Sequence, residues 1–152
     1  IEILSEIMSY MLYRTNAEKV ILDDEIDNVN NYLTLQKVRY KTDLISFEVL
    51  GNRNRIMVPP MVFIPIIENI FWSVDHTPKP PAISMKLIVE ESVLSFEINY
   101  YLRENSEEEK YWSGNRIKSI QRFLDLQLGS NNYNLEIKSE NNKYFIKLRI
   151  IL

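Results

Sequence analysis

The sequence contains no cysteine, one histidine and three glycines, and it lacks a long hydrophobic run. Without cysteine, the chain has no disulfide framework, no thiol nucleophile and no thiolate metal site, which fits a reducing compartment. No apolar run reaches the roughly 18 residues of a membrane-spanning helix, and no signal peptide is recognisable. The net charge of −3 and the lack of a basic stripe argue against nucleic acid as a partner.

Length and composition indicate one folded domain. The 152 residues can bury a sizeable core, and hydrophobic and charged fractions of 45% and 26% are ordinary for a globular protein. The chain begins at Ile1, inside a predicted helix, so we expect it to be a piece of a longer protein. We expect residues 1–41 to form a helical segment and residues 42–152 to form the main domain.

Helical and strand-like periodicities alternate along the chain. Apolar residues three and four positions apart predict helices, and strictly alternating ones predict strands. The predicted helices are an N-terminal one carrying Leu4, Ile7, Met8, Met11 and Leu12, then Asp23–Tyr40, Ile64–Trp72, and one after Gly114 that buries Ile117, Ile120, Leu124 and Leu128. The predicted strands are Ile45–Val49, Ile83–Val89, Leu94–Tyr100, Tyr133–Lys138 and Tyr144–Leu152, with residues 16–22, 75–81 and 103–113 as connecting segments. This order predicts an α+β fold, a two-layer sandwich.

The segment Pro59–Asn69 ends a hydrophobic run in a carboxylate next to a carboxamide. Its apolar helical residues would anchor Glu68 and Asn69 on the core, where their oxygens can hold Mg²⁺ or polarise a water. The alternative is that Glu68 simply lies on the surface and Asn69 bonds to the backbone. Taken alone, the residues favour this alternative.

Several segments together resemble the sensor histidine kinases of the LytS type, over nearly the whole chain. Residues 20–39 fit the family's stretch V-x-L-x-x-E-x-x-x-x-x-x-Y-L-x-x-x-K-x-R, and residues 4–10 are similar to the end of its dimerising and phosphoacceptor helices. Residues 59–69 fit its P-P-x-x-x-x-P-x-x-E-N segment, the N box of the GHKL ATPase fold. The resemblance implies the GHKL sandwich, a mixed, mainly antiparallel sheet with helices on one face, preceded by two helices.

The resemblance assigns roles to the Glu-Asn pair. In that family the N-box Asn holds the Mg²⁺ that bridges the ATP phosphates, and the adjacent Glu is a candidate catalytic base; these roles would fall on Asn69 and Glu68. The family's continuation, Lys-His-Gly, reads Trp72-Ser73-Val74 here. The family's phosphoacceptor histidine belongs upstream of Ile1, and we expect His76 to be a solvated loop residue.

The two remaining nucleotide motifs of the family are degraded in this chain. In the family, an Asp or Asn at the end of this strand accepts a hydrogen bond from the adenine amino group, and the matching positions here are Tyr100–Leu102. Asn99 could take this role only if the alignment were shifted by one residue, which would place it on the other face of the strand. Losing such a charged hydrogen bond costs about 1.5–3 kcal/mol. The motif Gly-x-Gly-Leu-x-Asn keeps Gly114 but has Arg116 at its second glycine, although a guanidinium can itself bind phosphate. The residues that the resemblance assigns to nucleotide are Asn69, Asn99, Gly114 and Arg116, with Mg²⁺ on Asn69 if ATP binds.

The resemblance implies the cytoplasmic ATP-binding fragment of a sensor histidine kinase in two-component phosphorelay signalling, cut from an inner-membrane sensor protein. With its degenerate motifs it would resemble a pseudokinase, with weak or no ATP binding. The implied partners are a second copy, through the N-terminal helices of the full-length protein, and a response regulator, with no membrane contact by this fragment. Two alternatives stay open: an active ATP-dependent protein-histidine kinase with atypical ligands, and a non-catalytic dimerisation or interaction module.

Overall fold

The helices and strands of the computed structural model follow the order that the periodicity predicts. The structure describes residues 2–13, 18–74, 82–101 and 115–152. Its helices are α1 (Glu2–Tyr13), α2 (Leu22–Tyr40), α3 (Ile64–Val74) and α4 (Asn115–Leu128). Its strands are β1 (Val20–Ile21), β2 (Ile45–Gly51), β3 (Met57–Val58), β4 (Ile83–Glu90), β5 (Val93–Tyr101), β6 (Tyr133–Glu140) and β7 (Lys143–Ile151). The connecting segments expected at 75–81 and 103–113, and with them His76, lie outside the described residues.

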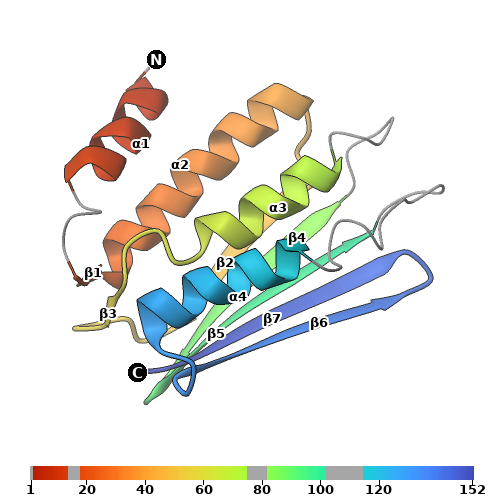
Figure 1. Cartoon of the computed structure of the whole chain (residues 1–152). Helices are drawn as coiled ribbons and strands as arrows, with labels where there is room; N and C mark the ends of the chain where they lie inside the picture. Colours follow the sequence, from red (N-terminus) through yellow and green to blue (C-terminus); the bar gives the residue numbers. More distant parts are fainter. Residues whose placement is uncertain (1, 14–17, 75–81, 102–114) are drawn as a thin grey trace.

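Five strands form one sheet in the order β2-β4-β5-β7-β6. Strands β2 and β4 run parallel, with Ile45 opposite Ile83, and the other neighbours are antiparallel. The parallel pair requires a crossover, which α3 supplies between the two strands. Helices α2, α3 and α4 cover one face of the sheet, and α1 lies on the outer side of α2 (Figure 1). The predicted α+β sandwich, with a mixed, mainly antiparallel sheet and helices on one face, is therefore confirmed.

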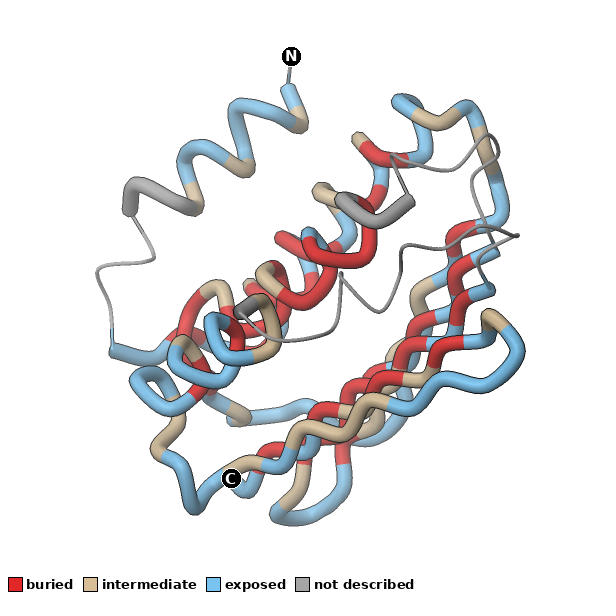
Figure 2. The backbone as a smooth tube through the Cα atoms, turned by 45° about the vertical axis from the view of Figure 1, so that its right-hand side comes forward, coloured by how far each residue is buried: buried red, intermediate tan, exposed pale blue. Residues whose placement is uncertain are grey.

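The core lies between the sheet and the helices. Along β4, Ile83, Met85 and Leu87 are buried, whereas Ser84 and Lys86 between them are exposed. This alternation places every second side chain under the helices, because successive residues of a strand point to opposite faces. Figure 2 shows the same pattern, with buried residues along the sheet and on the facing sides of the helices.

Helix α2 contributes to the same core as the sheet. Its buried apolar residues are Leu22, Ile26, Val29 and Leu33, and they belong to one hydrophobic cluster with the residues of the strands and of α3. The division at residue 41 stays a prediction, and the hydrophobic core is continuous across it. No helix in the described part of the chain is both long and apolar enough to cross a membrane.

A small antiparallel pair of strands, β1 with β3, was not predicted. Val20 lies opposite Val58 and Ile21 opposite Met57, and the backbone N–H of Leu22 donates to the carbonyl of Ile56 at 2.9 Å. The sequence predicted only a connector at residues 16–22, because strands of two residues show no periodicity. The pair fixes where α2 begins, which is at Leu22 rather than at Asp23.

A buried carboxylate connects α1, α2 and the segment that leads into α3. Glu25, in the first turn of α2, is fully buried, and its Oε1 accepts hydrogen bonds from the Tyr10 hydroxyl and from the backbone N–H of Met61. Met61 has a φ of +62°, which is unusual for a residue with a side chain. Burial raises the pKa of the Glu25 carboxyl, and the two hydrogen bonds only partly oppose this shift.

Candidate functional site

Helix α3 carries the Glu-Asn pair. It begins shortly after Pro59 and Pro60, which end β3 and cannot donate to a sheet. Its residues Ile66, Ile67 and Ile70 are fully buried and fix the helix on the sheet. Successive residues of a helix differ by about 100° in direction, so neighbouring side chains leave α3 on different sides.

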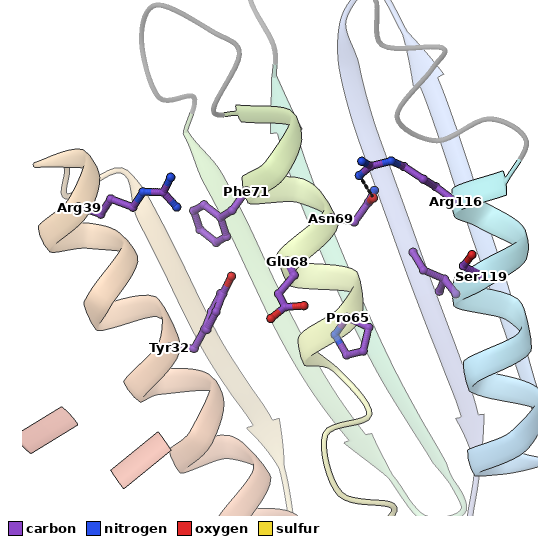
Figure 3. Close-up of a pocket in the computed structure, with 9 residues that line it drawn as sticks. Tyr32, Arg39, Pro65, Glu68, Asn69, Phe71, Arg116 and Ser119 are labelled. Atoms are coloured by element: carbon purple, nitrogen blue, oxygen red, sulfur yellow. Dashed lines mark hydrogen bonds between the residues drawn. The ribbon is translucent and has the colours of Figure 1, made fainter. Parts of the chain in front are cut away.

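Glu68 and Asn69 accordingly point to different neighbours. Figure 3 shows Glu68 on the side of Tyr32 in α2, and Asn69 directed toward Arg116 in α4. Glu68 is exposed, whereas Asn69 is only 8% exposed. The pair therefore does not converge on one point, although both residues line the same cleft.

The cleft runs between α2, α3 and α4 and has a volume of about 460 Å³. Its polar lining consists of Tyr32, Arg39, Glu68, Asn69, Arg116 and Ser119 (Figure 3). This volume falls within the range of about 300–1,000 Å³ found for small-molecule sites. The cleft is the candidate functional site.

The central polar contact of the cleft joins two of the predicted site residues. Nη1 of Arg116 donates a hydrogen bond to Oδ1 of Asn69 at 3.0 Å. Arg116 lies in the first turn of α4, and its side chain is partly buried. The oxygen that the resemblance assigns to Mg²⁺ therefore faces a fixed positive charge.

Mg²⁺ does not fit this arrangement. The ion would lie about 2.0–2.1 Å from an oxygen ligand, which places it close to the guanidinium that already bonds to the same atom. A doubly charged ion and a guanidinium about 4 Å apart repel by about 8 kcal/mol at an effective dielectric constant near 20, before solvent screening. As the side chains lie, Oδ1 of Asn69 accepts from Arg116 and orients its guanidinium.

Glu68 has an altered acidity. Desolvation by the surrounding protein raises the pKa of its carboxyl above the usual range. A carboxylate with a raised pKa can take up a proton nearer to neutral pH than an ordinary glutamate. Glu68 is therefore the carboxyl of the cleft, and it loses its charge at a less acidic pH than an ordinary glutamate does.

The other two predicted residues are not part of this cleft as described. Asn99 is exposed and lines a separate hollow beside Lys138 and Tyr144. Its neighbour Tyr100 is buried and stacks on Tyr144, with ring centroids 5.0 Å apart and an interplanar angle of 17°. Asn99 and Tyr100 thus lie on opposite faces of β5, as the alternation predicts. Gly114 lies outside the described residues.

Sequence reasoning did not assign Tyr32, Arg39 and Ser119 to the site, and the structure places them in it. Tyr32 and Arg39 are seven positions apart in one helix, about two turns, so they share a face of α2. Ser119 follows Arg116 by three positions in α4, which also gives neighbouring side chains. Helical spacing from Arg116 was therefore a signal for Ser119, whereas nothing in the sequence connected Tyr32 and Arg39 with the site, because α2 holds no predicted site residue.

Solved structures share this fold. The catalytic domain of the histidine kinase ThkA, in a nucleotide-free form, is similar with a TM-score of 0.60 and 12% identity, over 88% of this chain and 94% of that one. The histidine kinase AdeS of Acinetobacter baumannii gives a TM-score of 0.59 and 8% identity, over 99% of this chain and 75% of that one. ThkA in complex with the response regulator TrrA gives 0.57 and 13%, over 97% of this chain and 47% of that one. At such low identities, these similarities define the fold, which is that of histidine kinase catalytic domains.

Sequence comparison gives a shorter match. The family model described as "Histidine kinase" matches residues 1–44, which comprise α1, β1 and α2. A comparison with curated proteins finds no match. The sequence similarity to histidine kinases is therefore confined to the N-terminal helices, whereas the similarity of fold extends over 88–99% of the chain.

Proposed function

We propose that this chain is the nucleotide-binding domain of a sensor histidine kinase of the LytS type in two-component phosphorelay signalling, and that its binding of MgATP is weak or lost. The fold and the family match at residues 1–44 support the kinase part of this proposal. The observation that supports weak or lost MgATP binding is the hydrogen bond from Arg116 to Oδ1 of Asn69, the atom that would otherwise be available to Mg²⁺. The domain would then act by its conformation, passing a signal from upstream helices.

The adenine end of the family's site supports the same proposal. By the resemblance, the family's Asp or Asn falls at Tyr100–Leu102 in this chain. Of these residues, Tyr100 is 3% exposed and stacked on Tyr144. A phenol ring in this place lacks the carboxylate that accepts from the adenine amino group. The domain would therefore lack two of the contacts that select ATP.

Calorimetric titration of MgATP and MgADP into the chain, with a thermal shift scan beside it, tests the proposal. A nucleotide at 100 times its dissociation constant would stabilise the fold by about 2.7 kcal/mol. We expect no heat and no shift below about 1 mM nucleotide, which corresponds to binding weaker than about −4 kcal/mol. Binding of MgATP at micromolar affinity would contradict the proposal.

Glu68 supports a second candidate, an active kinase with atypical ligands. A carboxyl in a cleft with a raised pKa suits a general base, which works best when its pKa is near the working pH. This candidate predicts autophosphorylation of the full-length protein on its upstream histidine. It also predicts that Glu68→Gln lowers the rate about 100-fold or more, while Glu97→Gln on the sheet leaves it unchanged.

The proposal includes two partners and a location. ThkA has been solved with the response regulator TrrA, and a response regulator is the partner we propose for this chain in turn. The second partner is another copy of the chain through α1, on which Leu4 and Met8 are 51% and 53% exposed. The chain would be the cytoplasmic portion of an inner-membrane sensor protein. If a dimer forms, replacing Leu4 and Met8 by glutamate should turn it into a monomer in light scattering; an unchanged mass would exclude this interface.

A further inference from the structure

Glu25 of α2 is a buried acidic residue to which the cleft assigns no role. It is the glutamate of the stretch at residues 20–39, and it does not line the cleft between α2, α3 and α4. Because its side chain is fully buried, its oxygens need hydrogen-bond donors from the protein. Oε1 has two such donors, the Tyr10 hydroxyl of α1 and the backbone N–H of Met61. Glu25 therefore brings three separate parts of the chain together.

Met61 is the residue at which the chain turns toward α3. Its φ of +62° lies in the left-handed region, which residues with a side chain rarely adopt. Glu25 accepts from the backbone N–H of Met61, and Nδ2 of Asn28 donates to its sulfur at 3.2 Å. Glu25 and Asn28 are three positions apart in α2, so they lie on the same face of that helix. Two contacts from α2 therefore hold the turn at Met61 in its unusual conformation.

A short buried segment connects this turn with α3. Val62 and Phe63 follow Met61, are 0% and 1% exposed, and lead directly into the helix. The backbone N–H of Ile67 donates to the carbonyl of Phe63 at 3.3 Å, which joins the segment to the first turn of α3. Asn69 follows two residues later in the same helix. Because a close-packed interior has few voids to absorb a displacement, a shift at Met61 is passed on to α3.

We propose that Glu25 is a positioning residue for the cleft, which fixes the beginning of α3 through the backbone of Met61 and is itself held by Tyr10 of α1. The inference rests on the proposed function, in which the domain acts by its conformation, and it names the contact through which α1 acts on α3. When α1 moves away, Glu25 loses the Tyr10 hydroxyl and turns toward its remaining donor. The turn at Met61 then shifts with α3, and the hydrogen bond between Asn69 and Arg116 changes (Figure 3).

A second hydrogen bond between α1 and α2 provides a matched control. Nδ2 of Asn31 donates to Oε2 of Glu6 at 2.9 Å, and the pair is exposed. This bond joins the same two helices as the bond between Tyr10 and Glu25, but Glu25 takes no part in it. Asn31→Ala therefore weakens the contact of α1 with α2 without removing a donor from the buried carboxyl.

The test follows two NMR signals of the cleft, the side-chain amide of Asn69 and the backbone amide of Glu68. Tyr10→Phe removes the hydroxyl and keeps the ring, so we expect both signals to shift. Asn31→Ala should leave both signals in place, and the signals of β4 should stay unchanged in both variants. Shifts confined to α1 and the surroundings of Met61 would overturn the inference, as would equal shifts of the cleft signals in Asn31→Ala.

Two variants of Glu25 distinguish positioning from general support of the fold. Glu25→Gln keeps a side-chain oxygen that can accept from both donors, so it should leave the Asn69 signal close to that of the parent chain. Glu25→Ala removes the acceptor and should shift the signal at least as much as Tyr10→Phe does. Equal shifts in the glutamine and alanine variants would overturn the inference. If the alanine variant does not fold, the comparison of Tyr10→Phe with Asn31→Ala decides.

Titration of MgATP into the parent chain separates this inference from the proposed function. Cleft signals that respond to Tyr10→Phe, together with no MgATP binding below about 1 mM, support both. Responding signals together with micromolar MgATP binding support the inference and contradict the loss of nucleotide binding. Signals that do not respond, in a chain that binds no MgATP, overturn the inference alone.

Discussion

The hydroxyl of Tyr10 in α1 donates a hydrogen bond to Oε1 of Glu25 in α2. The same oxygen accepts the backbone N–H of Met61, just before α3, so one atom connects the N-terminal helix with the segment that positions the cleft. Asn28, also buried, adds a contact from its Nδ2 to the sulfur of Met61 at 3.2 Å. Tyr10 and Glu25 therefore link α1 directly to the backbone just before α3.

Glu25→Gln should change how stability depends on pH. The Glu25 carboxyl has an ordinary pKa near 4.5 in the unfolded chain and a raised pKa in the folded one. Between these two values the folded state binds more protons, so its free energy of unfolding falls as the pH rises, by about 1.4 kcal/mol per unit. Glutamine cannot ionise, so the free energy of unfolding of the variant should not fall in this way. Across this pH window the variant should therefore become more stable relative to the parent chain. Urea unfolding at a series of pH values measures the free energy of unfolding of both proteins. Parallel plots of this free energy against pH would contradict the prediction.

Tyr10→Phe should loosen α1 without unfolding the domain. The change removes one hydrogen bond to a buried carboxyl and should cost about 1–3 kcal/mol. Because the Tyr10 hydroxyl lowers the pKa of Glu25, its loss should raise that pKa further. Hydrogen exchange should show faster exchange in α1 and near Met61, with β4 and β5 unaffected. Uniform acceleration over the whole chain would instead indicate global destabilisation.

Leu124→Ala should destabilise the domain far more than Leu126→Ala. Leu124 is fully buried in the core, whereas Leu126, two positions further in the same helix, is 85% exposed. Truncating a buried leucine to alanine lowers the free energy of unfolding by about 2–5 kcal/mol, whereas a substitution at an exposed position changes it by no more than about 0.5 kcal/mol. Chemical denaturation of both variants measures the difference, and equal losses would contradict the orientation of α4.

Gly51→Ala should be more damaging than Gly129→Ala. Both glycines have positive φ, +100° and +84°, which costs a residue with a side chain about 1–2 kcal/mol. A Cβ at Gly51 would also lie 2.1 Å from the carbonyl oxygen of Val89, whereas one at Gly129 meets only the side-chain nitrogen of Asn132 at 3.1 Å. The melting temperatures should therefore separate clearly, with Gly51→Ala lower.

Much of the fold could be predicted because its periodicities are strong. The strand around Leu94, Phe96 and Ile98 alternates cleanly in the sequence, and all three residues are buried. Between the two predicted closing strands, Asn141 and Asn142 both have positive φ, which matches the tight turns that join hairpin strands. The pairing of β1 with β3 could not be predicted, because it depends on two short segments that meet only in the folded chain.

The candidate site was predictable in its parts and not in its connections. The segment Pro59–Asn69 predicted that Glu68 and Asn69 lie on a helix packed on the core, and both residues do lie in α3. Local patterns did not indicate that Glu68 and Asn69 point to different helices. They also did not indicate that Arg116, 47 positions further along the chain, contacts Asn69. Such a contact depends on how α3 and α4 lie beside each other on the sheet, which local patterns do not encode.

The outer strand β6 ends the sheet on one side, and its backbone is open to pairing along that edge. Its side chains include Glu136 and Lys138, whose charged groups lie 2.8 Å apart; the Lys138 side chain is 67% exposed and that of Glu136 is 40% exposed. Charged residues on an edge strand discourage another chain from adding to it. A strand from a second molecule would have to dehydrate this ion pair to extend the sheet, so the edge resists growth into aggregates or fibres.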